Sequence, residues 1–127
     1  MSTPRDAPHL PRLVPVDGYG KGGFQFGGMS HRGSILCLPS GIWAWPVNSI
    51  AEISESSLSR VWDEASQIDL FLLGSGTIPW SMPEALRWRF RDSRTTVEVM
   101  PTGPAIRTFN VLVAENRRVA AGLIAVD

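Results

Sequence analysis

The stretch "DLFLLGSGTIPWSMPE", residues 69–84, decides the class of fold. Its apolar run at 70–73 is continuous rather than alternating, which is typical of a strand buried on both faces of a parallel sheet. A glycine-serine-glycine turn follows, and Ser81 with Glu84 has the pattern of a capping box for a helix that runs to about Arg91. We therefore expect a strand, a loop and a helix in that order, as in α/β proteins.

Helices and strands continue to alternate on either side of this stretch. Residues 54–67 place apolar side chains at i, i+3, i+4 and i+7, which indicates an amphipathic helix. We also expect a strand at 95–100, a helix capped by Thr102 that ends near Asn116, and a closing strand at 117–126. The order α-β-α-β-α-β predicts a sheet with helices on both faces.

The first half of the chain has short strands separated by turns. We predict turns at 18–23 and 29–33, and strands at 10–16, 24–28, 34–39 and 42–47. Strands so close in sequence form an antiparallel hairpin or meander, and two prolines in the first of them place it at an edge. The expected organisation is a loose tail at 1–9 and a single α/β domain at 10–127.

The composition excludes several classes of protein and sets the expected compartment. Of 127 residues, 43% are apolar and 19% are charged, which argues against a disordered chain, a collagen or a coiled coil. The 12 basic and 12 acidic side chains cancel, so no overall field attracts nucleic acid. Cys37 is the only cysteine, no apolar run is long enough to span a membrane, and the amino terminus lacks a signal or transit pattern. We therefore expect a cytoplasmic protein.

Residues 18–23 read G-x-G-x-x-G, the fingerprint of a dinucleotide-binding loop. That loop must lead into a helix whose first N–H groups bind the pyrophosphate, whereas a strand is expected here at 24–28. A turn permitted by glycine is the favoured interpretation, and we expect no cofactor.

Two loops beyond strand ends form a candidate ligand cleft. If the strands at 70–73 and 95–100 are neighbours, the loops that follow them open at the same edge of the sheet. Arg107 would be the anion partner, because its guanidinium is planar and permanently charged. The favoured alternative is that the first loop is a structural turn, Arg107 a surface residue and Asn110 a structural hydrogen-bonding residue. The candidate cleft residues are Gly74, Ser75, Gly76, Thr102, Arg107, Thr108 and Asn110.

The sequence does not indicate catalytic or metal-binding chemistry. No nucleophile is paired with a base, His9 and His31 are interpreted as tail and turn residues, and no cluster of histidines or cysteines predicts a metal site. Glu98 has two interpretations, because it lies in a strand on the face opposite Val97 and Val99. An ion pair with an arginine is favoured, and a base within the cleft is the alternative. We predict no catalytic residue and favour a non-enzymatic protein.

The helix at 84–91 carries several arginines interleaved with aromatic residues. Residues two positions apart on a helix face different directions, so this is not a nucleic-acid stripe. A solvated helix face is the favoured interpretation, and a surface for a protein partner built on Trp80 and Trp88 is the alternative.

The ordered motifs of the chain resemble a known family. They are "GYGKGGFQFGG", "GSILCLP", "LFLLGSG", "VEVMPTGPAIRTFN" and "ENRRVAAGLI". This order is similar to the small α/β domain family of unknown function that includes mitochondrial NADH:ubiquinone oxidoreductase complex assembly factor 3 and the adipogenesis-associated domain-containing protein. The resemblance covers residues 10–126. It implies a three-layer domain, in which a central mixed β-sheet has helices on both faces and an additional β-hairpin or meander layer comes from the amino-terminal half.

The resemblance also frames the expected function. The family has no established catalytic activity, and its mitochondrial member acts by protein contact with another assembly factor. The chain shows no mitochondrial presequence, which fits a bacterial member. We expect a non-enzymatic binding or assembly-factor-like module with a protein partner. The alternatives are a domain that binds a small anion or phosphate-containing ligand at the cleft and, third, an enzyme that uses Glu98.

Overall fold

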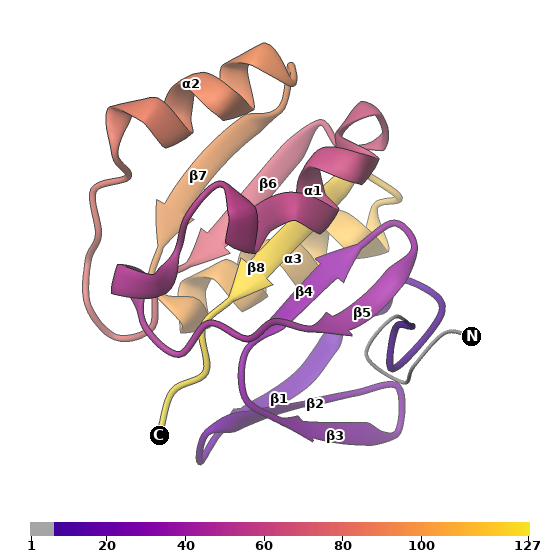
Figure 1. The fold of residues 1–127 in the computed structure, drawn as a ribbon. Helices are drawn as coiled ribbons and strands as arrows, with labels where there is room; N and C mark the ends of the chain where they lie inside the picture. The colour runs from indigo at the N-terminus through magenta and orange to yellow at the C-terminus, as the bar shows by residue number, and fades with distance from the viewer. Residues whose placement is uncertain (1–6) are drawn as a thin grey trace.

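The computed structural model describes residues 7–127 and contains two β-sheets and three α-helices (Figure 1). The larger sheet has the strand order β5-β4-β8-β6-β7, and the smaller has the order β1-β2-β3. The strands are β1 Val16–Gly20, β2 Gly23–Phe26, β3 Met29–Arg32, β4 Ile35–Leu38, β5 Gly41–Ala44, β6 Leu70–Gly74, β7 Thr96–Met100 and β8 Val119–Leu123. The α-helices are α1 Ser59–Glu64, α2 Glu84–Asp92 and α3 Thr102–Ala114.

The larger sheet is mixed, because its two halves arise from different kinds of connection. Strands β6, β7 and β8 run parallel, since helical crossovers join them. Strand β4 runs antiparallel to β5 and to β8, which places the hairpin from the first half of the chain beside the last strand. The mixed sheet predicted for this family is confirmed.

Each face of the larger sheet buries its own hydrophobic core. On one face, α1 and α2 cover a cluster that includes Phe71, Leu73 and Phe90. On the other face, α3 and the small sheet together cover a cluster that includes Leu72 and Phe109. Successive residues of β6 thus enter opposite cores, which explains its uninterrupted apolar sequence. The three-layer arrangement with an added β layer is confirmed, and the added layer shares a side with α3 (Figure 1).

Three predicted elements of the first half differ from the structure. Residues 10–15 are not a strand; Leu10 alone forms an isolated bridge with Ile42, because prolines at 11 and 15 lack N–H donors. Residues 29–32 are strand β3 rather than a turn. The turn before β3 is made by Gly27 and Gly28, which have φ values of 55° and 78°, as a tight hairpin turn requires. The helix expected at 54–67 divides into a 3-10 turn, α1 and a second 3-10 turn.

Two predicted helix caps are also wrong. Pro83 is extended and occupies the N-cap position of α2, so Ser81 lies too early in the chain to cap it. Pro101 occupies the same position before α3, and Thr102 is already the first helical residue. The predicted end of α3 is confirmed, since Asn116 has a φ of 58°, the left-handed conformation. Of the predicted tail, residues 1–6 lie outside the described part of the chain, and His9 donates its N–H to Ile42 O at 2.8 Å.

Candidate functional site

The loops after β6 and β7 lie together, because both strands end at the same edge of the sheet. Gly76 donates its N–H to Thr102 Oγ1 at 2.9 Å, and Thr102 donates its own N–H to Gly76 O at 2.9 Å. A side chain at Gly74 would approach Thr102 Cα at 3.0 Å, so glycine there permits the close approach of α3. The structure thus brings together four of the predicted cleft residues: Gly74, Ser75, Gly76 and Thr102.

The polar groups of these loops are used within the protein. The Thr102 hydroxyl accepts from Gly76 and donates to Ile124 O at 2.7 Å, and its side chain is fully buried. Ser75 is 3% exposed and donates its hydroxyl to Ile78 O at 2.7 Å and its N–H to Met100 O at 2.9 Å. These bonds join the ends of β6, β7 and β8, which is the structural-turn interpretation of the loop.

The three remaining cleft candidates lie elsewhere on α3. Arg107 is exposed, about 140° around the helix from Thr102, and makes no hydrogen bond or ion pair with residues 7–127. Thr108 is half-buried. Asn110 accepts from Val16 N–H and donates to Val16 O, both at 2.8 Å, and so fastens the small sheet to α3. Asn110 therefore has the structural role named as its alternative.

A hollow does lie beside the 74–76 loop, but α3 does not line it. It has a volume of about 380 Å³ and is lined by residues 48–50, 75–78 and 124–127. The sequence prediction missed the last of these segments. The signal was available, because β8 also runs parallel to β6, so the residues after it must emerge at the same edge.

Glu98 lies in the middle of β7, opposite Leu72, and its side chain is exposed. It forms no ion pair with any residue from 7 to 127, so the favoured pairing with an arginine is absent there. It also lies outside the hollow beside Ser75. A catalytic role for Glu98 stays an untested prediction.

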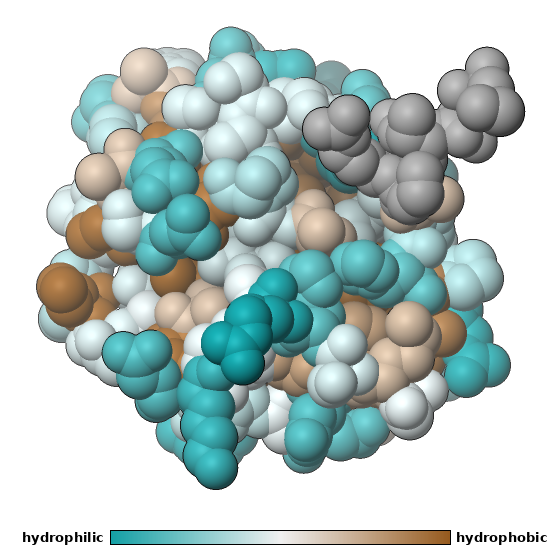
Figure 2. Space-filling view, turned by 60° about the horizontal axis from the view of Figure 1, so that its bottom comes forward, coloured by the Kyte–Doolittle hydropathy of each residue, from teal (hydrophilic) through white to brown (hydrophobic). Residues whose placement is uncertain are grey.

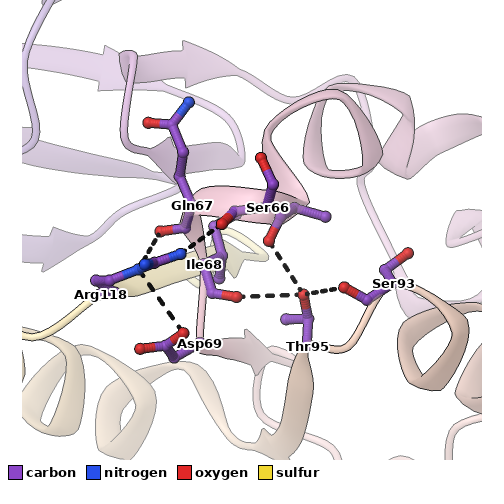
Figure 3. A network of polar contacts seen from close by, with 8 residues as sticks. Ser66, Gln67, Ile68, Asp69, Ser93, Thr95 and Arg118 are labelled. Carbon is purple, nitrogen blue, oxygen red and sulfur yellow. Dashed lines mark hydrogen bonds and ion pairs between the residues drawn. The ribbon is translucent and has the colours of Figure 1, made fainter.

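The opposite end of the parallel strands is held by a second polar network (Figure 3). Arg118 donates to the backbone carbonyls of Ser66 and Gln67 and lies 3.7 Å from the carboxylate of Asp69. On the other side of this segment, the buried Thr95 hydroxyl faces three carbonyls, the nearest being Ile68 O at 3.3 Å. Hydrogen bonds thus also join the segments in which β6, β7 and β8 begin.

Of the two aromatic residues predicted to meet a partner, Trp88 lies on α2 and Trp80 lies in the loop before it. Trp88 is 50% exposed, and the Arg91 guanidinium lies 4.6 Å from the centre of its ring. Trp80 is partly buried against the core beneath α1 and α2. Arg89 points away from Arg91, toward the ring of Trp62, as the helical spacing predicts.

A basic groove lies between α2 and β7, and the sequence analysis missed it. Arg87, Arg91 and Arg94 line a space of about 440 Å³ together with Phe90 and residues 95–97. The spacing i, i+4, i+7 places these three arginines on one side of the helix and the turn after it. Arg94 has a φ of 58° and redirects the chain from α2 into β7.

Residues 16–124 match the family described as "Protein of unknown function (DUF498/DUF598)". The chain belongs to this family. An uncharacterised protein of Rhodobacter capsulatus is 33% identical over 121 residues, which cover 95% of this chain and 91% of that protein. The NADH dehydrogenase (ubiquinone) 1 alpha subcomplex assembly factor 3 of Drosophila melanogaster is 37% identical over 114 residues, or 86% of this chain. The resemblance inferred from the ordered motifs is confirmed.

A solved structure of a relative has the same fold. The crystal structure of a protein from Bartonella henselae, described as an outer membrane protein, is 46% identical with a TM-score of 0.90 and covers 94% of this chain and 100% of that one. The chain spans only 57% of the length of the Drosophila relative. Within the described part of the chain, no helix has the length and apolar character needed to cross a membrane.

Proposed function

We propose that this member of the DUF498/DUF598 family is a non-enzymatic protein-binding module of the assembly-factor type, and that the α2 side of the molecule meets its partner. The observation that carries the proposal is the contrast between the two candidate surfaces. The hydroxyls of Ser75 and Thr102 are used in internal hydrogen bonds, whereas Trp88 on α2 is half exposed beside Arg91. Tryptophan and arginine are the side chains that most often anchor protein interfaces.

The names of the longer relatives support this function. Seven of the similar proteins are called assembly factors of NADH dehydrogenase, and they are 31–37% identical to this chain. Because this chain shares their domain, we expect it to bind a protein partner as they do, although the partner need not be the same complex. A cytoplasmic location is part of the same proposal and rests on the composition, in which Cys37 is the only cysteine.

Other exposed hydrophobic residues do not offer an equivalent surface. The face turned forward in Figure 2 carries hydrophobic side chains in separate patches divided by hydrophilic atoms. The other large exposed hydrophobic residues are Tyr19 on β1, Met29 on β3, Ile78 in the loop after β6 and Val111 on α3, and no arginine from residues 7–127 is stacked on any of them. Trp88 is the one that combines an aromatic ring with a stacked arginine.

The test is affinity capture from cells that express the tagged chain, followed by rebinding of the captured protein in purified form. Trp88→Ala is expected to weaken rebinding at least about tenfold, the loss typical of a binding anchor. Val111→Ala is the control, because this residue is 56% exposed on the opposite side of the sheet. The proposal fails if no protein is captured reproducibly, or if both variants rebind as tightly as the wild type.

A further inference from the structure

We propose that the outer edge of β7 binds an extended peptide segment that carries carboxylate side chains, by adding it as a strand to the larger sheet. This inference rests on the proposed function and names the chemistry of the partner at the α2 side. Two independent features of the molecule point to it: the unpaired backbone of β7 and the three arginines beside it.

The backbone of β7 is paired on one side only. In the strand order of the larger sheet, β7 is the last strand and pairs with β6 alone. At one end, Thr96 donates its N–H to Asp69 O at 3.0 Å; at the other, Met100 O accepts from Ser75 N–H at 2.9 Å. Because a parallel ladder uses alternate residues, Val97 and Val99 direct their N–H and C=O groups away from β6.

At the opposite edge of the same sheet, the outward backbone groups of Ile42 in β5 have hydrogen-bond partners, which those of Val97 and Val99 lack within the described part of the chain. There, His9 donates its N–H to Ile42 O at 2.8 Å, and Ile42 donates its N–H to Leu10 O at 2.9 Å. The amino-terminal segment thus pairs with β5 at Ile42, through an isolated antiparallel bridge. Among residues 7–127, no hydrogen bond reaches the outer edge of β7 at Val97 or Val99. Exposed edges of this kind are templates for strand addition.

The groove beside this edge selects for carboxylates. Arg87, Arg91 and Arg94 line it where β7 begins, and a guanidinium binds a carboxylate through paired hydrogen bonds. The described residues that line the groove include no Asp or Glu, so its charged groups are all positive. A segment that satisfies the backbone of Val97 and also extends past Thr96 must pass these arginines, which favours Asp or Glu in that part of it.

A second copy of this chain fits the edge less well. In a symmetric antiparallel pair, the four outward groups are all satisfied only when Val97 of one copy lies opposite Val99 of the other. That register places Glu98 opposite the Glu98 of the second copy, and like charges at directly opposed positions destabilise a pair of strands. A heterologous acidic segment avoids this repulsion.

The experiment uses the full chain and acetylated, amidated peptides of about eight residues in which Glu and Thr alternate. Binding is followed by fluorescence anisotropy and by amide NMR shifts. We expect the Glu peptide to bind, the matched Lys peptide not to bind, and an N-methylated Glu peptide to lose binding because it cannot donate to the edge. The amides of Val97 and Val99 should shift more than those of Thr96 and Glu98, which already face β6.

Charge-reversed proteins complete the test. The double variant R91E/R94E should weaken binding of the Glu peptide about tenfold, whereas R117E, an exposed arginine near the start of β8, should not change it. The inference is overturned if no peptide binds, if N-methylation has no effect, if the Lys peptide binds equally, or if the chain only dimerises through β7. If no peptide binds but the captured partner still depends on Trp88, the inference fails and the proposed function stands. If the Glu peptide binds and no partner is captured, the inference about β7 stands and the proposed function fails.

Discussion

Replacing Thr102 with valine should destabilise the fold strongly, although the two side chains have nearly the same shape. The hydroxyl is fully buried, accepts from Gly76 N–H at 2.9 Å and donates to Ile124 O at 2.7 Å. Valine leaves both backbone groups buried without a partner. Each such loss costs about 1–3 kcal/mol, so the expected loss of unfolding free energy is about 2–6 kcal/mol.

The measurement is urea and thermal denaturation followed by circular dichroism. At about 4 °C per kcal/mol for a chain of this length, Thr102→Val should lower Tm by about 8–24 °C. Thr102→Ser is the matched control, because it keeps the hydroxyl and removes one buried methyl group worth about 1 kcal/mol. Equal destabilisation by valine and serine would refute the reasoning, since packing rather than hydrogen bonding would then hold Thr102 in place.

Three further predictions concern other polar residues. Asn110→Ala removes both bonds to Val16 and should cost about 1–3 kcal/mol, with faster amide hydrogen exchange at Val16 as the local readout. Phosphate should not raise Tm, and Arg107→Ala should behave as the wild type, whereas a rise that the variant loses would place an anion site at Arg107 after all. Burial, and then the adjacent His9, lower the pKa of His31 from its ordinary 6.5. The unfolded chain therefore binds more protons below that pH, stability falls with acidification, and His31→Gln should flatten the decline of Tm on the acidic side of neutrality; an unchanged slope would contradict this.

The second half of the fold could be predicted because its signals are local. The uninterrupted apolar strand and the helical spacing at 102–113 each lie within one element, and parallel connections then determine the order of the layers. Strand β3 could not be predicted in this way. Its sequence "MSHR" is polar and mostly exposed, and it is a strand only because the turn at Gly27 and Gly28 folds it back onto β2.

In the candidate site, too, the features set by local signals could be predicted and those set by distant residues could not. That the loops after β6 and β7 meet follows from strand direction, which the sequence indicates. The use of the Thr102 hydroxyl depends on Gly76 and Ile124, which are 26 and 22 residues away, and no local pattern reports such distant partners. The basic groove could have been predicted, since Arg87, Arg91 and Arg94 are spaced at i, i+4 and i+7 on one side of the helix. A comparison of arginines two positions apart does not detect this spacing.

The polar residues at both ends of the parallel strands lead to one conclusion about where this domain can act. In α/β proteins that bind small ligands, the carboxyl edge of the sheet presents unused donors to the ligand. Here Thr102 and Ser75 tie that edge together, and Thr95 and Arg118 do the same at the amino edge. The backbone groups of the sheet that are still unpaired lie along its sides. Residues 9 and 10 already pair with Ile42 on the side at β5, so the side at β7 is where we propose that a partner adds to the sheet. A change in the residues around that edge would alter the choice of partner without disturbing either core, since one fold can carry different functions.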